Sequence, residues 1–432
     1  MGFEAILIFL AFVAALIVFL TTGVPVAVAM GLIAAIGLYF FQSPAALNQL
    51  SSIAFSSATN FALIVVPLFI LMGELVARSA ISRQLFRAAQ TWVGRVPGAL
   101  AISSIFGSMG FAAVSGSSPV TAATIGSVAI PEMQREGYNR SLAFGAVASG
   151  GTLGILIPPS IVLILYGIIT ENSIGDLFVA AIVPGTITAL LLVATVLVIV
   201  LRHPEYAPRA TTRTTWLEKV RSTSSLAPVL VLFALVMGSI YLGIATPSES
   251  AAVGAVGAAI IVFVVARISR QEIWMALSST AQTTAMFILL VIGGLFVAFM
   301  LNLLGVPQGL AGLLTGLDLP PWAILIAINI VLILMGMFMD PLSILVIMVP
   351  LLAPAVVLLG YDPIWFGVMF TLNIEIGMVT PPVGLNLFIL KSVVPDASFS
   401  EIIRGSVWFV VPLVLGLAIL IAFPDLALFL VR

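Results

Sequence analysis

The amino-acid sequence predicts an all-α polytopic membrane protein built from two repeats, and three observations support this fold class. Of the 432 residues, 62% are hydrophobic and only 8% are charged, whereas charged residues make up about 25% of soluble domains. Most of the chain consists of apolar runs close to the ~20 residues that cross a bilayer as a helix. Two of these runs are interrupted by adjacent prolines, Pro158-Pro159 and Pro381-Pro382, which lie 223 positions apart.

Ten apolar runs are candidate membrane helices: 4–22, 24–41, 55–77, 141–170, 177–201, 226–243, 248–266, 278–303, 364–390 and 406–429. Two further apolar regions, 98–131 and 321–355, are interrupted midway, at 115–119 and at 340–343. Two half-helices around such a break are typical of a re-entrant hairpin, which enters and leaves the membrane on one face. Each half, 1–222 and 223–432, is therefore expected to hold five membrane helices and one hairpin, with one of the five helices broken (141–170 or 364–390).

The double prolines predict breaks inside the membrane. Proline has no N–H and clashes with the carbonyl four residues back, so Pro158-Pro159 deprives the carbonyls of Gly154 and Ile155 of their helical partners. The second pair is expected to free Gly377 in the same way. An unpaired carbonyl in hydrocarbon costs several kcal/mol unless it is buried in protein or faces a polar cavity. The breaks are therefore expected to line a site.

The distribution of basic residues orients the predicted helices, because cytoplasmic loops carry an excess of Lys and Arg. The basic positions placed in the cytoplasm are Arg78, Arg83, Arg87, Arg95, Arg135, Arg140, Arg202, Arg209, Arg213, Lys219, Arg221, Arg267, Arg270, Lys391 and Arg404. The acidic positions placed outside are Glu171, Asp176, Asp318 and Asp362. This distribution predicts ten crossings, two hairpins and both termini outside. Segment 78–95 resembles an interfacial amphipathic helix, acting as an anchor or as a lever between moving parts.

Matches between the halves predict a repeat, and the number of crossings in each half predicts that it is inverted. At an offset of 223, Pro131 matches Pro354, Gly154 matches Gly377, and Ser117 falls on Asp340. Five crossings per repeat is an odd number, so the second repeat is expected to lie upside down relative to the first. Inverted repeats with broken helices are the architecture of secondary transporters, which bind substrate near the middle of the bilayer.

The breaks and hairpin tips also predict what is bound. Half-helix N-termini present N–H groups to anions, and unwound carbonyls and hydroxyls suit a hard cation such as Na⁺. One cation cage is expected where Ser115–Ser118 faces Gly150–Gly154, and its partner where Asp340 faces Gly377–Thr380, so two or more Na⁺ ions are predicted. The alternative is that these Gly/Ser patches only allow tight turns and close helix packing.

The predicted site residues fall into two overlapping sets. The predicted Na⁺ ligands are Ser115, Gly116, Ser117, Gly150, Thr152, Gly154, Asp340, Gly377 and Thr380. The predicted substrate-binding residues are Ser117, Ser118, Thr152, Asp340, Thr380 and Asn386.

Acidic residues within the apolar spans have several open roles, because such groups are rare in membranes and usually functional. Asp340 is expected to stand at a cation site, to titrate or to hold the hairpin tip. Glu375 lies two residues before Gly377 and is expected to orient the unwound segment. Glu74 is equally consistent with a structural contact. Glu249 follows Pro247 in the first turn of a helix, where a capping role is favoured.

The composition excludes several functions. The net charge of −1 argues against nucleic acid as a partner. The sequence has no cysteine, and its single histidine, His203, lies in an arginine-containing loop, so no catalytic residues are assigned. The first apolar run follows Met1 without a basic segment and is expected to be a retained helix rather than a cleaved signal peptide.

Seven motifs give the chain a resemblance to a known family. They are PLFILMGE (67–74), SGSS (115–118), GTLGILIPPS (151–160), TPSE (246–249), GMFMDP (336–341), PPVGLNLF (381–388) and FPDL (423–426). The sequence resembles, over essentially its whole length, the large membrane subunit of TRAP (tripartite ATP-independent periplasmic) transporters. One departure is Ser250, where the family pattern has alanine.

The resemblance implies Na⁺-coupled uptake of organic acids across the bacterial inner membrane by an elevator mechanism. It also implies two partners, a small four-helix membrane subunit and a periplasmic substrate-binding protein. The family's Na⁺ and substrate regions fall on Ser115–Ser118, Gly150–Gly154, Asp340 and Gly377–Thr380. No arginine lies deep in the membrane to clamp a carboxylate, so dicarboxylates, sialic acid and 2-oxo acids all remain candidate substrates.

Three other functions are distinguishable by experiment. A standalone Na⁺/dicarboxylate symporter of similar design would transport without a binding protein. A passive channel would conduct without a Na⁺ gradient. An intramembrane protease would cleave peptide bonds, although the sequence lacks cysteine, intramembrane histidine and paired aspartates.

Overall fold

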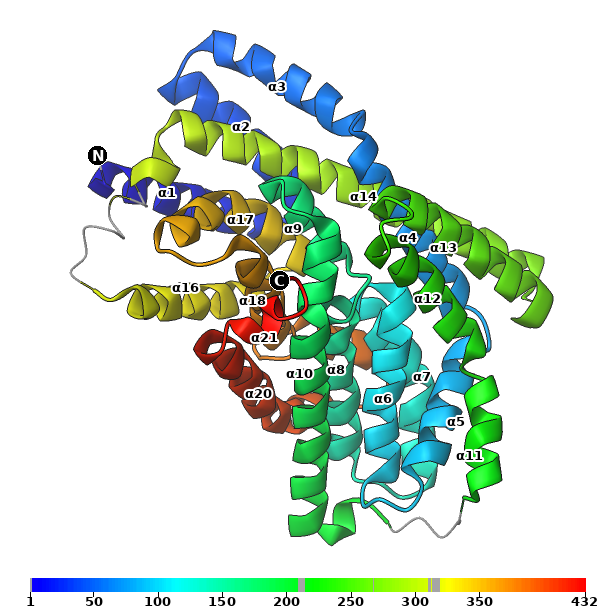
Figure 1. The fold of residues 1–432 in the computed structure, drawn as a ribbon. Coiled ribbons are helices and arrows are strands. Elements are labelled where there is room, and N and C mark those ends of the chain that lie inside the picture. The colour runs from blue at the N-terminus through cyan, green and yellow to red at the C-terminus, as the bar shows by residue number, and fades with distance from the viewer. Residues whose placement is uncertain (1, 209–213, 267, 310–311, 313–318) are drawn as a thin grey trace.

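The computed structural model describes residues 2–208, 214–266, 268–309, 312 and 319–432, which form helices without a strand (Figure 1). Of the residues used above for orientation, Arg209, Arg213, Arg267 and Asp318 lie outside this described part. Six helical segments are long and apolar enough to cross a membrane, or eight if each of two bent pairs counts as one span. The described chain is therefore that of a multi-pass membrane protein.

The chain begins with α1 (Gly2–Thr21), α2 (Val26–Phe41), α3 (Pro44–Ala58), the 3₁₀ turn η1 (Phe61–Ile64) and α4 (Val65–Ala77). The prediction of one helix over 55–77 is wrong, because this segment bends by 49° between α3 and η1. The side chain of Asn60 accepts a hydrogen bond from the N–H of Ala62 at 2.9 Å and so starts a new helical turn. Asparagine favours such caps because its short side chain reaches the free N–H groups of a helix start.

Helix α5 (Ile81–Val93) is amphipathic, as predicted for segment 78–95. It buries Leu85 and Phe86 and exposes Arg83 and Arg87. It also contacts α11 (Trp216–Ser224). Helix α11 lies in a region that the sequence predicts to be a loop. Trp92 Nε1 donates a hydrogen bond to Thr223 Oγ1 at 3.2 Å, which ties α5 to α11.

The middle of the chain folds into α6 (Ala99–Ser115), α7 (Ser118–Arg135), α8 (Arg140–Leu156), α9 (Ile161–Thr170), α10 (Ile174–Arg202) and the 3₁₀ turn η2 (Pro204–Tyr206). Helices α6 and α7 contact each other and occupy the region of the first expected hairpin. Helices α8 and α9 are separated by residues 157–160, which contain the first double proline. The predicted break is therefore present.

The rest of the chain contains α12 (Ala227–Tyr241), α13 (Pro247–Ile261), the π-turn η3 (Val262–Ala266), α14 (Arg270–Leu303), α16 (Pro321–Gly336), α17 (Pro341–Leu358), α18 (Pro363–Met378), α19 (Leu385–Val393), α20 (Phe399–Ala422) and α21 (Asp425–Leu428). Proline stands in the first turn of α13, α16, α17 and α18, where its missing N–H costs nothing. The second double proline separates α18 from α19. The order of a helix pair followed by a broken helix thus occurs twice.

The bounds of α20 correct the predicted helix 406–429. The helix begins earlier, at Phe399, because Ser398 and Glu401 form a capping box. It ends at Ala422, shortly before Pro424, which cannot continue a helix. Helix α17, expected as one arm of the second hairpin, also has the length and apolarity of a full span.

Helices α8 and α18, which precede the two breaks, form the centre of the molecule. Every residue of α8 from 142 to 156 is buried, and so is every residue of α18 from 365 to 378. Helix α8 packs against α6, α7, α10 and α20, while α18 packs against α10, α16, α17 and α20 (Figure 1). The two proline breaks therefore lie at the ends of the most enclosed helices.

Candidate functional site

The first tip, residues 115–118 between α6 and α7, packs against the break between α8 and α9. The N–H of Ile161, the first residue of α9, donates a hydrogen bond to the carbonyl of Gly116 at 3.3 Å. On the α8 side, a Cβ atom added to Gly154 would lie 2.6 Å from the carbonyl oxygen of Ser117. Glycine is therefore required at position 154. The first tip and the first break lie together, as the predicted cation cage requires.

Hydroxyl groups tie the first tip internally. Thr121 Oγ1 donates a hydrogen bond to the carbonyl of Ser117 at 2.8 Å, and Ser115 Oγ lies 2.8 Å from Thr121 Oγ1. Thr152 Oγ1 donates to the carbonyl of Ser149 within its own helix, at 2.6 Å. The other predicted ligand on α8, Gly150, packs against α6, because an added Cβ would lie 3.0 Å from the hydroxyl of Ser108.

Ser118, the first residue of α7, connects the first tip to α18. Its hydroxyl donates a hydrogen bond to Glu375 Oε1 and also lies 3.4 Å from the carbonyl of Thr152. Glu375 is fully buried, and among the described residues its other carboxylate oxygen, Oε2, has no hydrogen-bond partner. The sequence predicts that Glu375 is an intramembrane acid, but it associates this residue with the second break alone.

The second tip, residues 337–340 between α16 and α17, meets the second break in a similar way. The N–H of Gly384, immediately before α19, donates a hydrogen bond to the carbonyl of Met337 at 3.2 Å. A Cβ atom added to Gly377 would lie 2.5 Å from the Cα of Gly336. Gly377 and Gly384 stand 223 positions after Gly154 and Ile161, so the two breaks make their contacts from matched positions. The tip residues that accept the hydrogen bonds, Gly116 and Met337, do not fall at this offset.

Asp340 caps the helix that follows the second tip. Its Oδ1 accepts hydrogen bonds from the N–H groups of Leu342 and Ser343 at 3.1 and 3.0 Å. Its Oδ2 accepts a hydrogen bond from the hydroxyl of Ser343. These contacts show Asp340 holding the tip, which is one of the three roles that the sequence leaves open for it.

The structure corrects the expectation that the carbonyl of Gly377 is free. This carbonyl accepts a hydrogen bond from the N–H of Thr380 at 3.0 Å, because the chain makes one more tight turn after α18 before it reaches the double proline. The hydroxyl of Thr380 bonds to the carbonyl of Ile376. Thr380 thus closes the C-terminal end of α18.

Asn386 brings the second broken helix into contact with the first. Its Nδ2 donates a hydrogen bond to the carbonyl of Ala148 in α8 at 3.3 Å, and its Oδ1 has no partner among the described residues. Other buried side-chain atoms in the described interior also lack hydrogen-bond partners: Ser108 Oγ, Ser149 Oγ, Asn373 Oδ1 and Glu375 Oε2. Buried polar atoms are almost always hydrogen-bonded, so these groups are available to bind a water molecule, an ion or a ligand.

The two remaining acids have structural contacts. Glu74 forms an ion pair with Arg78, with Oε2 3.0 Å from Nε. Glu249 forms a capping box with Thr246 at the start of α13, as the sequence favours. Its carboxylate accepts hydrogen bonds from the N–H and the hydroxyl of Thr246, both at 2.8 Å.

Comparisons with known proteins identify the family. The family profile described as "Tripartite ATP-independent periplasmic transporter, DctM component" matches residues 13–426. The chain belongs to this TRAP transporter family. The chain is 37% identical over 387 residues to a C4-dicarboxylate TRAP transporter large permease protein of Pseudomonas aeruginosa, covering 89% of this chain and 90% of the relative.

Two other relatives widen the comparison. A sialic acid TRAP transporter large permease protein of Vibrio cholerae is 33% identical over 373 residues, which are 86% of each chain. An isethionate TRAP transporter permease protein of Oleidesulfovibrio alaskensis, which bears the name DctMQ, is 35% identical over 385 residues. The match covers 87% of this chain and 59% of that relative. This chain is accordingly a TRAP transporter large permease subunit.

A solved structure supports the fold. The Alcanivorax borkumensis YdaH transporter has a TM-score of 0.60 to this chain at 15% identity, covering 88% of this chain and 89% of that one. At this identity the likeness concerns the fold alone. The sequence-based resemblance to the TRAP large subunit is thus confirmed by the family match.

Proposed function

We propose that this TRAP permease subunit carries an organic acid anion together with Na⁺ into the cell across the bacterial inner membrane. The observation that carries the proposal is the matched pair of contacts between tips and breaks. Ile161 bonds to Gly116 in the first half, and Gly384 bonds to Met337 in the second. The breaks after α8 and α18 contact the tips before α7 and α17. Secondary transporters bind substrate and coupling ions at sites built from such discontinuous helices.

The proposed architecture is two inverted repeats, 1–222 and 223–432, with the helix pairs α6/α7 and α16/α17 as re-entrant hairpins. The break residues Gly154 and Ile161 recur at an offset of 223 as Gly377 and Gly384, which supports this arrangement. With ten crossings and the basic segments in the cytoplasm, both termini lie on the periplasmic side.

The proposed coupling ions are two or more Na⁺. The candidate site offers hydroxyl, amide and carbonyl oxygens together with the Asp340 carboxylate. Such hard donors suit Na⁺ better than a soft metal. The first ion is assigned to Ser115–Ser118 and Gly150–Gly154, and the second to Asp340 and Gly377–Thr380.

The proposed substrate is an acid anion of the dicarboxylate, sialic acid or 2-oxo acid class. Two of the relatives above carry names for C4-dicarboxylate and sialic acid. Helix α7 starts at the first tip without a side-chain cap, so its N–H groups and positive dipole end can receive an anion there. The proposed substrate contacts are Ser117, Ser118, Thr152, Asp340, Thr380 and Asn386.

The proposed movement is an elevator, in which the tips and broken helices travel as one body. The site elements are joined by backbone contacts at Gly154 and Gly377 and by the Ser118–Glu375 hydrogen bond. Contacts this close hold the two halves of the site together, so displacement of the whole body is easier than separation of its parts.

The proposed partners are a small four-helix membrane subunit and a periplasmic substrate-binding protein, with no nucleic acid involved. The relative whose name joins the DctM and DctQ components supports the first of these. A binding protein also supplies selectivity that a site without a deep arginine lacks.

Reconstitution tests the proposal. The chain is placed in liposomes with its small subunit, and uptake of labelled succinate or sialic acid is measured with binding protein outside. We expect uptake driven by an inward Na⁺ gradient and absent with K⁺. Uptake without binding protein would instead favour a standalone symporter, and flux without a Na⁺ gradient would favour a channel.

A further inference from the structure

Two buried side-chain oxygens in the described interior, Glu375 Oε2 in α18 and Asn386 Oδ1 at the start of α19, lack a hydrogen-bond partner. Both side chains are fully buried. The other polar atom of each side chain is already used, because Ser118 donates to Glu375 Oε1 and Asn386 Nδ2 donates to the carbonyl of Ala148. Only the nitrogen of an amide can donate to a carbonyl, so Oδ1 is the atom of Asn386 that stays free to receive a ligand.

The two free oxygens approach the same face of α8. Asn386 contacts α8 at the carbonyl of Ala148, and Ser118, which holds Glu375, lies 3.4 Å from the carbonyl of Thr152. Ala148 and Thr152 are one helical turn apart, about 5.4 Å, on one side of the helix. Helix α8 contacts α7, α18 and α19, and α19 also contacts α7. Glu375 and Asn386 therefore reach one small region enclosed by these four helices.

No basic side chain neutralises Glu375 in the part of the chain that the structure describes. Helix α18 itself contains no Lys or Arg. Arg140 begins α8 but lies twelve positions before Thr152, about 18 Å along the helix axis, and it pairs with Asp396 at 3.0 Å. In the last turn of α19, Lys391 donates hydrogen bonds to two backbone carbonyls of the following loop.

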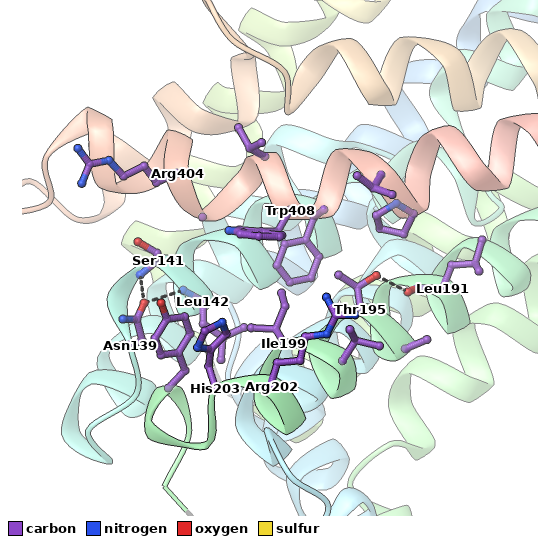
Figure 2. A pocket seen from close by; sticks show the side chains of 18 of the residues that line it. Asn139, Ser141, Leu142, Leu191, Thr195, Ile199, Arg202, His203, Arg404 and Trp408 are labelled. Atoms are coloured by element: carbon purple, nitrogen blue, oxygen red, sulfur yellow. Dashed lines mark hydrogen bonds between the residues drawn. The ribbon is translucent and has the colours of Figure 1, made fainter.

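Figure 2 shows where basic side chains gather near α8 instead. Asn139 accepts hydrogen bonds from two N–H groups in the first turn of α8, and Arg202 and Arg404 line a pocket at this same end. Thr152 stands near the opposite end of the helix. The carboxylate of Glu375 therefore lies away from this basic end, although a buried charge is normally paired or bound to a metal ion.

The repeat places this region where the two halves meet. Glu375 stands 223 positions after Thr152, so the two residues occupy matched positions, and Ser118 contacts both. The first half has a hydroxyl where the second half has a carboxylate, so the charge is present once. The two Na⁺ sites proposed above include neither Glu375 nor Asn386.

We propose that Glu375 and Asn386 form a further Na⁺ site, in addition to the two assigned above; this inference rests on the proposed Na⁺ coupling. The carboxylate supplies the charge and the amide oxygen a neutral hard donor, a combination that suits Na⁺. A water molecule would satisfy Asn386 but leave the carboxylate charge unpaired in the interior. Because Glu375 precedes the second break and Asn386 follows it, a bound ion joins α18 to α19 across that break.

Equilibrium binding of ²²Na⁺ tests the site. The full-length chain, purified with its small subunit, is titrated at fixed pH without substrate or binding protein. Glu375→Gln is expected to bind one Na⁺ fewer per chain at saturation. The matched control is Glu74→Gln, which removes another acid of the apolar spans, one that pairs with Arg78, and should bind as many ions as wild type. Equal numbers of ions bound to wild type and to Glu375→Gln would overturn the inference and leave the proposed function standing. A wild type that binds no Na⁺ would contradict both.

A second variant tests the other ligand with the carboxylate in place. Asn386→Ala is expected to weaken Na⁺ binding at one site about tenfold, a size typical of altered metal sites. An unchanged unfolding temperature in K⁺ checks that the variant is folded, and this variant also decides the matter if Glu375→Gln does not fold. Wild-type Na⁺ affinity at every site in Asn386→Ala would overturn the proposed pair.

Discussion

Ser118 at the first tip donates a hydrogen bond to Glu375 in α18, although 257 residues separate them. This contact joins the first helix pair to the second broken helix, so the two halves of the candidate site are physically connected. Glu375 Oε2 lacks a partner among the described residues, and a buried carboxylate is costly unless it is paired or neutral.

Glu375→Gln should separate the charge of this side chain from its hydrogen bond. The amide oxygen can still accept from Ser118, so the fold is expected to survive. If the carboxylate takes part in ion coupling, Na⁺-driven uptake should fall about tenfold, the effect of about 1.4 kcal/mol. Uptake by proteoliposomes, measured beside the unfolding temperature, checks this. Unchanged uptake would remove Glu375 from the site.

Gly154→Ala and Gly377→Ala should each disturb the contact between a tip and a break. Backbone atoms would lie 2.6 and 2.5 Å from the added methyl groups, and backbone cannot yield as a flexible side chain can. We expect lower thermal stability and little uptake for both. The matched control is Gly238→Ala in α12, where nothing lies within 4 Å; it should be neutral or stabilise by about 0.5–1 kcal/mol.

Asp340→Asn should keep the cap of α17 and remove the charge, because Asn and Asp cap helices about equally well. We expect Na⁺-driven uptake to be abolished or strongly impaired while the protein still inserts. Ser117→Ala should cause a smaller loss. Asp340→Ala, which also removes the cap, should lower stability by about 1 kcal/mol. If Asp340→Asn keeps normal Na⁺ dependence, the residue is only a cap.

Thr246→Ala tests the structural contact that caps α13. Loss of the capping box with Glu249 should lower the free energy of unfolding by about 1 kcal/mol without changing the Na⁺ dependence of uptake. Ser248→Ala, two residues away in the same turn, has no such role and serves as the control. A change in Na⁺ dependence in the Thr246 variant would place α13 in the coupling machinery.

Local signals in the sequence were sufficient to place the two breaks and the first tip. The second tip lies at 337–340 rather than at the predicted interruption 340–343, because Pro341, Leu342 and Ser343 form the first turn of α17. Adjacent prolines cannot continue a helix wherever they occur, and the Gly/Ser tip at 115–118 ends α6 as expected. The capping role of Glu249 in α13 was likewise expected from its place in the first turn after Pro247.

Long-range contacts were not predictable from the same signals. Nothing near Glu375 in the sequence points to Ser118, because their meeting depends on how α7 and α18 both pack against α8. The hydrogen bond between Asn373 Nδ2 and Asn329 Oδ1, at 2.7 Å, depends on packing in the same way. The bend at Asn60 was missed because a single capping side chain is a weak signal within an apolar run.

Thermal unfolding of the purified chain in Na⁺ and in K⁺ at equal ionic strength tests the central claim most directly, because an ion that binds only the folded state raises its stability. We predict a higher unfolding temperature in Na⁺ for the wild type and for Gly238→Ala. The difference between the two salts should shrink in Gly154→Ala and in Gly377→Ala. Identical unfolding temperatures in Na⁺ and K⁺ for the wild type would contradict a Na⁺ site at the tips and breaks.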